Sequence, residues 1–356
     1  MTSFLEDSTL DHLRQIVQDD APDISRYRIV ESIGQGGMGT VYLADDLTLG
    51  RRVAMKVLRD DAANADAVDR MLREAHVVAR LEHPGIVPVH DVGRLPDGRV
   101  FYIMKLVKGR RLDEYAETSA SLQERLRLFE RICETVAFAH VHGVIHRDLK
   151  PQNVMVGQFG EVLVLDWGLA KLVREMTHGV SSRGGSHTAP SPPWAGLSES
   201  IAPQTAHGTV LGTPAYMSPE QAGGEVNQVD ERSDVFALGG VLYFLLTGKS
   251  PRTEGRSGES DAGPAIVRPR QRNRAVSRRL ESICLKALST DPEHRYASAA
   301  ELAADVARFL NGQAVVAHHE GLPERFVRWT WWYRAPILII TAYLLMRGLL
   351  ILWQRR

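Results

Sequence analysis

Two patterns of hydrophobic and polar positions divide most of the chain. Between residues 27 and 104, short segments alternate apolar and polar residues between Gly and Asp turns, which predicts strands at YRIVESIG, GTVYLADD and RRVAMKVLRD. One helix is expected among them, because apolar residues recur at helical spacing from Val68 to Leu81 and His83-Pro84 follows. From about Leu112 onward the periodicity is helical. A strand-rich unit (27–104) followed by a helical unit (105–310) predicts an α+β, bilobal fold.

The remaining segments have other compositions. Residues 1–26 form an acidic leader, with six acids and one Arg in the first 23 positions. Residues 176–207 are rich in Ser, Gly, Pro and Thr, which predicts a long inserted loop. After residue 310 comes a connecting segment, 311–334, and then an apolar stretch, 335–353.

The apolar stretch has the length of a transmembrane helix. Its ten Leu and Ile residues favour insertion by about 3 to 6 kcal/mol, while Arg347 costs about 2.5 to 3.5 kcal/mol at a helix centre. Aromatic residues flank it, as at membrane interfaces: Trp329, Trp331, Trp332, Tyr333 and Trp353. We expect a single-pass membrane anchor; the alternatives are a buried core helix and a helix lying flat in the interface. Only three residues follow it, so no external sensor domain is expected.

Composition excludes several classes of protein. Hydrophobic residues make up 44% and charged residues 24%, so neither a disordered chain nor a fibrous repeat is expected. Lys+Arg and Asp+Glu balance at 43 each, which gives no reason to expect a nucleic-acid partner. The two cysteines, Cys133 and Cys284, cannot form a disulfide framework and are expected to fill the core.

A glycine-rich segment offers the first candidate chemistry. Residues 34–41 read G-x-G-x-x-G-x-V, and such glycines let backbone N–H groups approach phosphates closely. A dinucleotide-binding fold would open a helix here, but the strand TVYLA follows, which favours a glycine loop between two antiparallel strands. Lys56 lies in the next strand and Glu74 in the predicted helix, so the carboxylate is placed to hold the lysine beside bound phosphates.

Three further motifs follow in a fixed order. Residues 146–153 read HRDLKPQN, residues 166–168 read DWG, and residues 212–220 read GTPAYMSPE. Together with the glycine loop, they resemble the motifs of protein kinases from about Tyr27 to Leu310. The residues of these motifs are similar to those of bacterial eukaryotic-like (Hanks-type) Ser/Thr kinases. The C-terminal segment, with its aromatic residues ahead of the apolar stretch, resembles that of the membrane-anchored members.

The resemblance implies a role for each motif residue. Asp148 would orient the attacking hydroxyl, Lys150 would lie near the transferred phosphate, and Lys56, held by Glu74, would bind the α- and β-phosphates of ATP. Asn153 and Asp166 would hold Mg²⁺. The remaining ATP-binding positions would be Ile33, Gly34, Gln35, Gly36, Gly37, Met38, Gly39, Val41, Ala54, Met104, Leu106 and Met155. Glu220 and Arg295 would form a buried ion pair, and Asp234 would anchor the catalytic loop.

The sequence departs from the family pattern at two places that bear on regulation. Trp167 stands where Phe is usual, and the larger indole must pack against the regulatory helix. The activation segment, 166–220, is long because of the 176–207 insertion, and Thr205 and Thr209 are candidate phosphorylation sites. A phosphate there would pair with Arg147.

The function that the resemblance implies is transfer of the ATP γ-phosphate to Ser/Thr hydroxyls of proteins (EC 2.7.11.1), with autophosphorylation in the activation loop and a possible homodimer. The expected location is the bacterial inner membrane, with the kinase domain in the cytoplasm. One alternative is a pseudokinase that binds ATP and serves as a scaffold. The other is a small-molecule phosphotransferase, against which Lys150 and the 212–220 segment argue.

Overall fold

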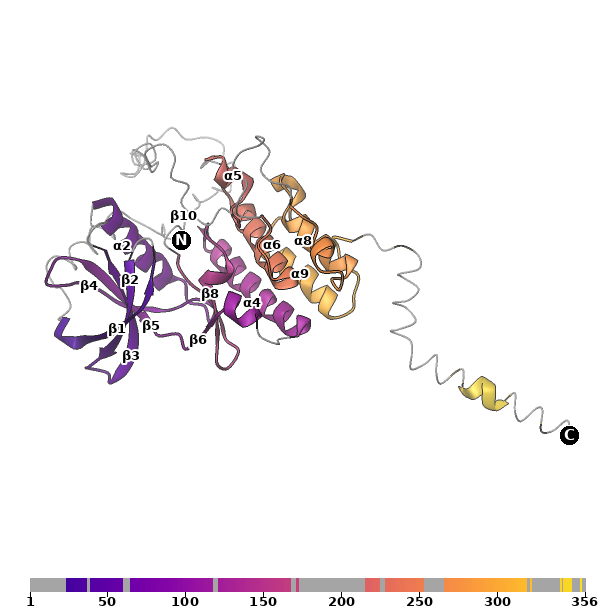
Figure 1. The fold of residues 1–356 in the computed structure, drawn as a ribbon, viewed down its shortest axis with the longest axis horizontal. Coiled ribbons are helices and arrows are strands. Elements are labelled where there is room, and N and C mark those ends of the chain that lie inside the picture. Colours follow the sequence, from indigo (N-terminus) through magenta and orange to yellow (C-terminus); the bar gives the residue numbers. More distant parts are fainter. Residues whose placement is uncertain are drawn as a thin grey trace, which may run out of the picture.

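The computed structural model describes residues 24–36, 39–59, 65–117, 121–167, 171–172, 215–224, 228–252, 266–318, 321, 340, 342–347 and 353. Several predicted features lie outside these residues: positions 1–23 of the leader, the 176–207 insertion, Gly37, Met38, Thr205 and Thr209. Two lobes follow each other along the chain, the first drawn in indigo and violet and the second in magenta to orange (Figure 1).

The first lobe is a twisted antiparallel sheet with one helix beside it (Figure 1). Its strands are β1 (Tyr27–Gln35), β2 (Gly39–Asp46), β3 (Arg51–Leu58), β4 (Val89–Arg94) and β5 (Val100–Lys105), in the order β1-β2-β3-β5-β4. A short 3-10 helix, η1 (Ile24–Arg26), precedes β1. The helix predicted between Val68 and Leu81 is α2 (Ala65–Arg80).

Each face of this sheet has its own apolar cluster because side chains alternate along a strand. On one side, Met71, Leu72 and Ala75 of α2 pack with Leu58 and Tyr102. The other cluster consists of Tyr27, Ala44, Val53, Met55, Val57, Leu95, Phe101 and Ile103. Full burial of each large apolar side chain contributes about 1.5 to 3 kcal/mol, so α2 is held mainly by this packing.

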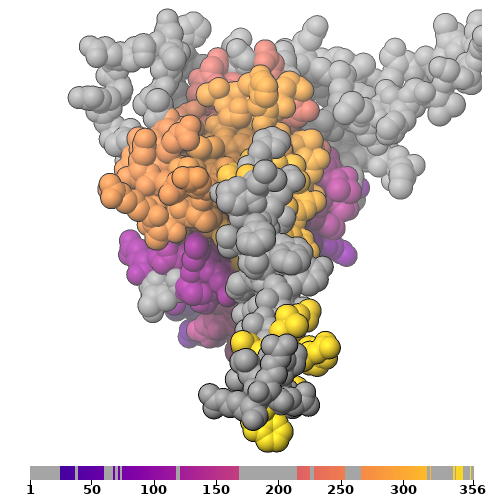
Figure 2. All heavy atoms as spheres, turned by 90° about the vertical axis from the view of Figure 1, so that its right-hand side faces the viewer, coloured from indigo at the N-terminus to yellow at the C-terminus, as the bar shows by residue number. Residues whose placement is uncertain are grey.

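The second lobe is mainly helical. Its helices are α3 (Leu112–Ala116), α4 (Leu122–Val141), α5 (Pro219–Ala222), α6 (Glu231–Thr247), α7 (Pro269–Arg272), α8 (Arg278–Ala287) and α9 (Ala299–Leu310), with the 3-10 turns η3 (Pro151–Asn153) and η4 (Pro292–His294). Ser121, Asp230, Ser277 and Ser298 cap α4, α6, α8 and α9 by accepting backbone N–H groups. The end of the lobe formed by residues 266–318 faces the viewer in Figure 2, in orange.

Helix α6 forms the centre of this lobe. Most of its side chains are buried, and it packs against α4, α8 and α9 in one large apolar cluster. Cys133 and Cys284 are both 0% exposed in that cluster, so the prediction that they fill the core is confirmed. Burial raises the pKa of both thiols, which keeps them protonated.

Short strands at the lobe junction carry the loops that the motifs predicted. β6 (Gly109–Arg111), β8 (Val154–Gly157) and β9 (Val162–Val164) form one small sheet, and β7 (Val144–Ile145) pairs with β10 (Lys171–Leu172). The HRDLKPQN segment lies between β7 and β8, and Asp166 follows β9. The predicted α+β, bilobal fold is therefore confirmed.

The predicted transmembrane helix has no counterpart among the described residues. Within that part of the chain, no helix has the length and apolar character needed to cross a membrane. Of the predicted span 335–353, the structure describes only residues 340, 342–347 and 353, all helical.

Candidate active site

The glycine loop joins β1 and β2 as an antiparallel hairpin. Gln35 pairs with Thr40 and Gly34 with Val41, and the Gly36 N–H donates to the Gly39 carbonyl at 2.9 Å. A Cβ atom on Gly39 would lie 2.5 Å from the Val57 carbonyl oxygen, so glycine is required where this strand crosses β3. The prediction of a glycine loop between antiparallel strands is confirmed.

Lys56 is the centre of a buried charged cluster. Its Nζ donates to Glu74 at 2.8 Å (Oε1) and 3.1 Å (Oε2), and to Asp166 Oδ1 at 2.9 Å. The side chains of Lys56 and Glu74 are 9% and 2% exposed, whereas that of Asp166 is 50% exposed. The helix α2, the strand β3 and the turn after β9 thus meet at one ammonium group.

Electrostatics keep this cluster ionised. Burial by itself would lower the pKa of Lys56, but Glu74 and Asp166 together raise it above its ordinary value. Burial would raise the pKa of Asp166, yet the charge and hydrogen bond of Lys56 lower it. At neutral pH the lysine is therefore a fixed cation and Asp166 a carboxylate.

The catalytic-loop motif places two polar side chains, Lys150 and Asn153, against the Asp148 carboxylate. Lys150 Nζ donates to Asp148 Oδ2 at 2.8 Å. Asn153 Nδ2 donates to the Asp148 carbonyl at 2.8 Å and to Oδ2 at 3.1 Å. The contacts share Oδ2, so they fix the orientation of the Asp148 carboxylate.

Asp234 on α6 binds the backbone of the catalytic loop. It is 0% exposed on α6, and its carboxylate accepts the N–H groups of His146 and Arg147, both at 2.8 Å. His140 Nε2 makes a third contact, at 2.8 Å. Burial would raise the pKa of Asp234, but these hydrogen bonds lower it. The predicted anchoring role is confirmed, and it supports Arg147 at φ 69°.

The donor set suits Mg²⁺. Because the Asn153 amide nitrogen is committed to Asp148, its amide oxygen remains for a metal ion, and Asp166 supplies a carboxylate. Among the described residues no group of three or more His, Cys, Asp and Glu side chains gathers as a metal cage. Mg²⁺ does not need one, since it binds through one or two protein oxygens plus substrate phosphates and water.

The predicted adenine-binding positions come from neighbouring strands. Val41 on β2 pairs with Lys56, and Ala54 pairs across β3 and β5 with Met104. Met155 lies on β8 in the other lobe. Ile33 is 48% exposed on β1.

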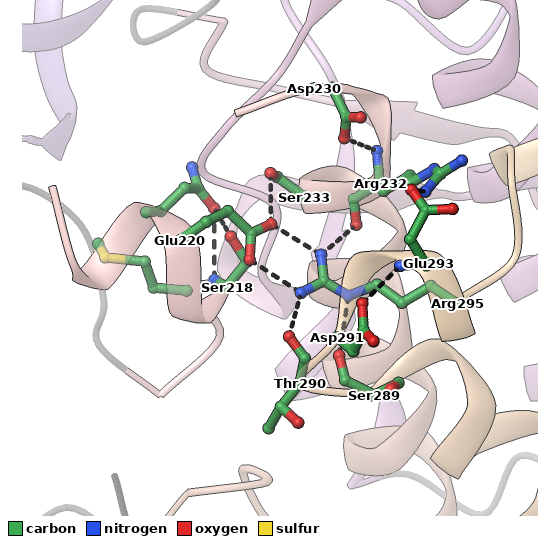
Figure 3. A network of polar contacts seen from close by, with 12 residues as sticks. Ser218, Glu220, Asp230, Arg232, Ser233, Ser289, Thr290, Asp291, Glu293 and Arg295 are labelled. Atoms are coloured by element: carbon green, nitrogen blue, oxygen red, sulfur yellow. Dashed lines mark hydrogen bonds and ion pairs between the residues drawn. The ribbon is translucent and has the colours of Figure 1, made fainter. Parts of the chain in front are cut away.

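A second polar network lies where α5 meets the helices of the second lobe (Figure 3). Arg295 donates to Glu220 at 2.7 Å (Oε1) and 2.8 Å (Oε2), and Ser233 donates to Oε1 at 2.7 Å. The remaining guanidinium N–H groups bind the carbonyls of Ser289, Thr290 and Arg232. The predicted ion pair is confirmed. It holds α5, and Gln221 on that helix donates to the Arg147 carbonyl at 3.1 Å.

Two supporting residues were missed by sequence reasoning. Tyr102 donates its hydroxyl to Glu74 Oε1 at 2.9 Å, and His140 binds Asp234. Tyr102 pairs with Lys56 across β3 and β5, but strand register cannot be derived from one strand alone. His140 occupies an ordinary buried position of a helical pattern, so nothing in the sequence marks it.

Comparison with known families agrees with this site. The protein kinase domain family matches residues 27–194 and 195–306. The chain belongs to the protein kinase family. The matched residues include the glycine loop, the catalytic loop and the Glu220–Arg295 pair of this kinase.

Similar curated proteins include two bacterial kinases. Serine/threonine-protein kinase PknD of Protochlamydia amoebophila is 36% identical over 315 residues, covering 81% of this chain and 30% of that protein. PknB of Mycolicibacterium smegmatis is 39% identical over 302 residues, covering 81% and 44%. The kinase chain thus spans less than half the length of these curated relatives.

A solved structure is also similar. The Mycobacterium tuberculosis PknI kinase domain superposes with a TM-score of 0.57 at 26% identity, covering 82% of this chain and 97% of that one. The resemblance to bacterial Hanks-type kinases is therefore confirmed.

Proposed function

We propose that this chain is a Ser/Thr protein kinase that transfers the γ-phosphate of ATP to protein hydroxyls, with its lobes at 27–104 and 105–310. The observation that carries the proposal is that two clusters of polar side chains, one around Asp148 and one around Lys56, have all their predicted members in contact. Asp148 is held by Lys150 and Asn153, and Lys56 is held by Glu74 beside Asp166.

The chemistry follows from these positions. The oxygen of a substrate Ser or Thr attacks the γ-phosphorus, the bond from that phosphorus to the β–γ bridging oxygen breaks, and Asp148 takes the hydroxyl proton. Lys150 lies 2.8 Å from the same carboxylate, where its charge stabilises the phosphoryl oxygens. Lys56 would neutralise the α- and β-phosphates.

Asn153 and Asp166 would hold Mg²⁺, which when bound would neutralise negative charge on the phosphates. The glycine loop would cover them with backbone N–H groups, since Gly34, Gly36 and Gly39 close a tight hairpin. The adenine ring would lie against Ile33, Val41, Ala54, Met104, Leu106 and Met155.

Activation by phosphorylation is part of the proposal. Arg147 precedes Asp148, and within the described part of the chain its Nε and Nη2 are buried without a hydrogen-bond partner. Burial lowers the pKa of this guanidinium, so a phosphate beside it would be strongly favoured. Thr205 and Thr209 are the candidate sites, and autophosphorylation between two copies would place a phosphate there.

We also propose that residues 335–353 anchor the kinase in the bacterial inner membrane as a single-pass helix, with the catalytic lobes in the cytoplasm. Support comes from the apolar composition of that segment and the aromatic residues on both sides of it. The membrane is then a partner of the chain, besides ATP and protein substrates.

The decisive experiment is phosphate transfer with a matched binding control. The full chain, purified in detergent micelles, is incubated with Mg²⁺ and labelled ATP beside Asp148→Asn, and phosphorylated positions are mapped by mass spectrometry. We expect label on Ser and Thr in the wild type, at least a hundredfold less in Asp148→Asn, and equal ATP affinity in both. ATP binding without transfer in the wild type would support the pseudokinase scaffold instead.

A further inference from the structure

Trp167, the residue that departs from the family pattern, is buried and contacts both the end of β9 and the catalytic loop. Its side chain is 2% exposed and shares an apolar cluster with Val77 and Val78 of α2. The indole Nε1–H donates to the Val164 carbonyl at 3.3 Å. The ring also lies 4.6 Å from the His146 ring, centroid to centroid, at 50°.

The hydrogen bond closes the turn that carries Asp166. Val164 ends β9 and Trp167 follows three residues later, so the Nε1–H···O contact spans Leu165 and Asp166. Asp166 has φ 61°, a left-handed conformation that is unfavourable for a residue with a Cβ atom. A phenylalanine at 167 could pack in the same place but has no N–H to donate.

The ring contact connects this turn to the catalytic loop. The Asp148 N–H donates to His146 Nδ1 at 3.2 Å, so Nδ1 is the acceptor nitrogen, and Nε2 donates to the Leu165 carbonyl at 2.9 Å. His146 therefore bridges the backbone beside Asp148 and the backbone beside Asp166. Trp167 packs against this imidazole.

We propose that Trp167 is a positioning residue for the metal site: its indole N–H, which the usual Phe lacks, closes the turn at Val164 and, beside the ring contact with His146, holds Asp166 in the orientation that binds Mg²⁺. The inference rests on the proposed function for the identity of the metal, but not on phosphate transfer itself. Trp167 contacts no reacting atom, and its effect passes through Asp166 and His146.

The test compares metal binding in the full chain and in Trp167→Phe, purified in detergent micelles. Mg²⁺ is titrated calorimetrically into protein saturated with adenylyl imidodiphosphate, a non-hydrolysable ATP analogue. We expect Trp167→Phe to bind Mg²⁺ about two- to twelvefold more weakly, the range that corresponds to one neutral hydrogen bond. Trp167→Tyr, which also lacks an N–H at this position, should behave in the same way.

Two controls separate positioning from general destabilisation. Trp353→Phe makes the same chemical change on a side chain that is 77% exposed, and it should leave Mg²⁺ affinity unchanged. Affinity for the analogue without Mg²⁺ should be equal in wild type and Trp167→Phe, because the proposed effect is on the metal ligand only.

Equal Mg²⁺ affinity in wild type, Trp167→Phe and Trp167→Tyr would overturn the proposal. The proposal would also be overturned if Trp167→Phe bound the metal-free analogue more weakly by the same factor as it bound Mg²⁺, because this would indicate a purely structural role. Failure of the proposed function gives a different result: the wild type would transfer no phosphate while the Mg²⁺ titrations still distinguished Trp167→Phe.

Discussion

The Glu220–Arg295 pair allows the sharpest test of the structure, because its energetics can be worked out from the contacts. The Arg295 side chain is 0% exposed and its five N–H donors all have acceptors, two of which are the oxygens of Glu220. Replacing Glu220 by Gln keeps the shape but removes the negative charge and one acceptor oxygen. A buried guanidinium is then left partly unpaired.

Two lines of reasoning give the expected loss in the free energy of unfolding. Breaking a buried ion pair by altering one partner typically costs about 3 to 5 kcal/mol. Burial would raise the pKa of Glu220, but hydrogen bonds from Arg295 and Ser233 lower it to about 2. Against the ordinary value of 4.5, this corresponds to about 3 kcal/mol at neutral pH. We therefore expect Glu220→Gln to lower the free energy of unfolding by about 3 kcal/mol or more.

The assay is thermal unfolding of the full chain at pH 7, followed by circular dichroism. A loss of this size should lower the melting temperature by on the order of 10 °C. Glu293→Gln is the matched control, because Glu293 pairs with Arg232 in the same region (Figure 3) but its side chain is 79% exposed. An exposed pair contributes about 0 to 1 kcal/mol, so this variant should melt within a few degrees of wild type.

The pH dependence has a defined sign. Because folding lowers the pKa of Glu220, its contribution is fully present above pH 4.5 and is lost as the pH falls toward 2. The stability difference between wild type and Glu220→Gln should therefore narrow below about pH 4.5. A Glu220→Gln variant that melts like Glu293→Gln at pH 7, or a difference that grows with acidity, would refute the reasoning.

Three further outcomes are expected. Lys56→Met should weaken ATP binding about 10- to 150-fold, which corresponds to the loss of one charged hydrogen bond. The control Lys105→Met, at an exposed position, should leave ATP affinity unchanged. Equal ATP affinities of the two variants in a nucleotide titration would contradict the role of Lys56 in binding phosphate. Gly39→Ala should weaken ATP binding and also lower the melting temperature, because a Cβ atom 2.5 Å from the Val57 backbone carbonyl must displace the hairpin. Wild-type ATP affinity in a folded Gly39→Ala protein would show that the loop does not contact phosphate. Truncation after residue 321 should move the protein from the membrane pellet to the supernatant after lysis, and a truncated chain still in the pellet would exclude 335–353 as the sole anchor.

Some features of the protein were determined by local sequence. The alternating pattern of 27–58 and the glycines of 34–39 predict a hairpin with a phosphate-binding loop, because strand alternation and glycine conformation depend on neighbouring residues. The HRDLKPQN and DWG motifs likewise name Asp148, Asn153 and Asp166 as site residues without any tertiary information.

Tertiary structure decided how these residues meet. Lys56 and Asp166 are 110 positions apart, and only the packing of α2 and of the second lobe against the sheet sets their separation at 2.9 Å. The support given by Tyr102 and His140 and the contacts of Trp167 also depend on strand register and helix packing. A single strand or helix does not encode its partner, because the same pattern of apolar positions is compatible with many pairings. Sequence thus named the groups that we propose for the chemistry, and the packing of the two lobes determined how those groups are oriented.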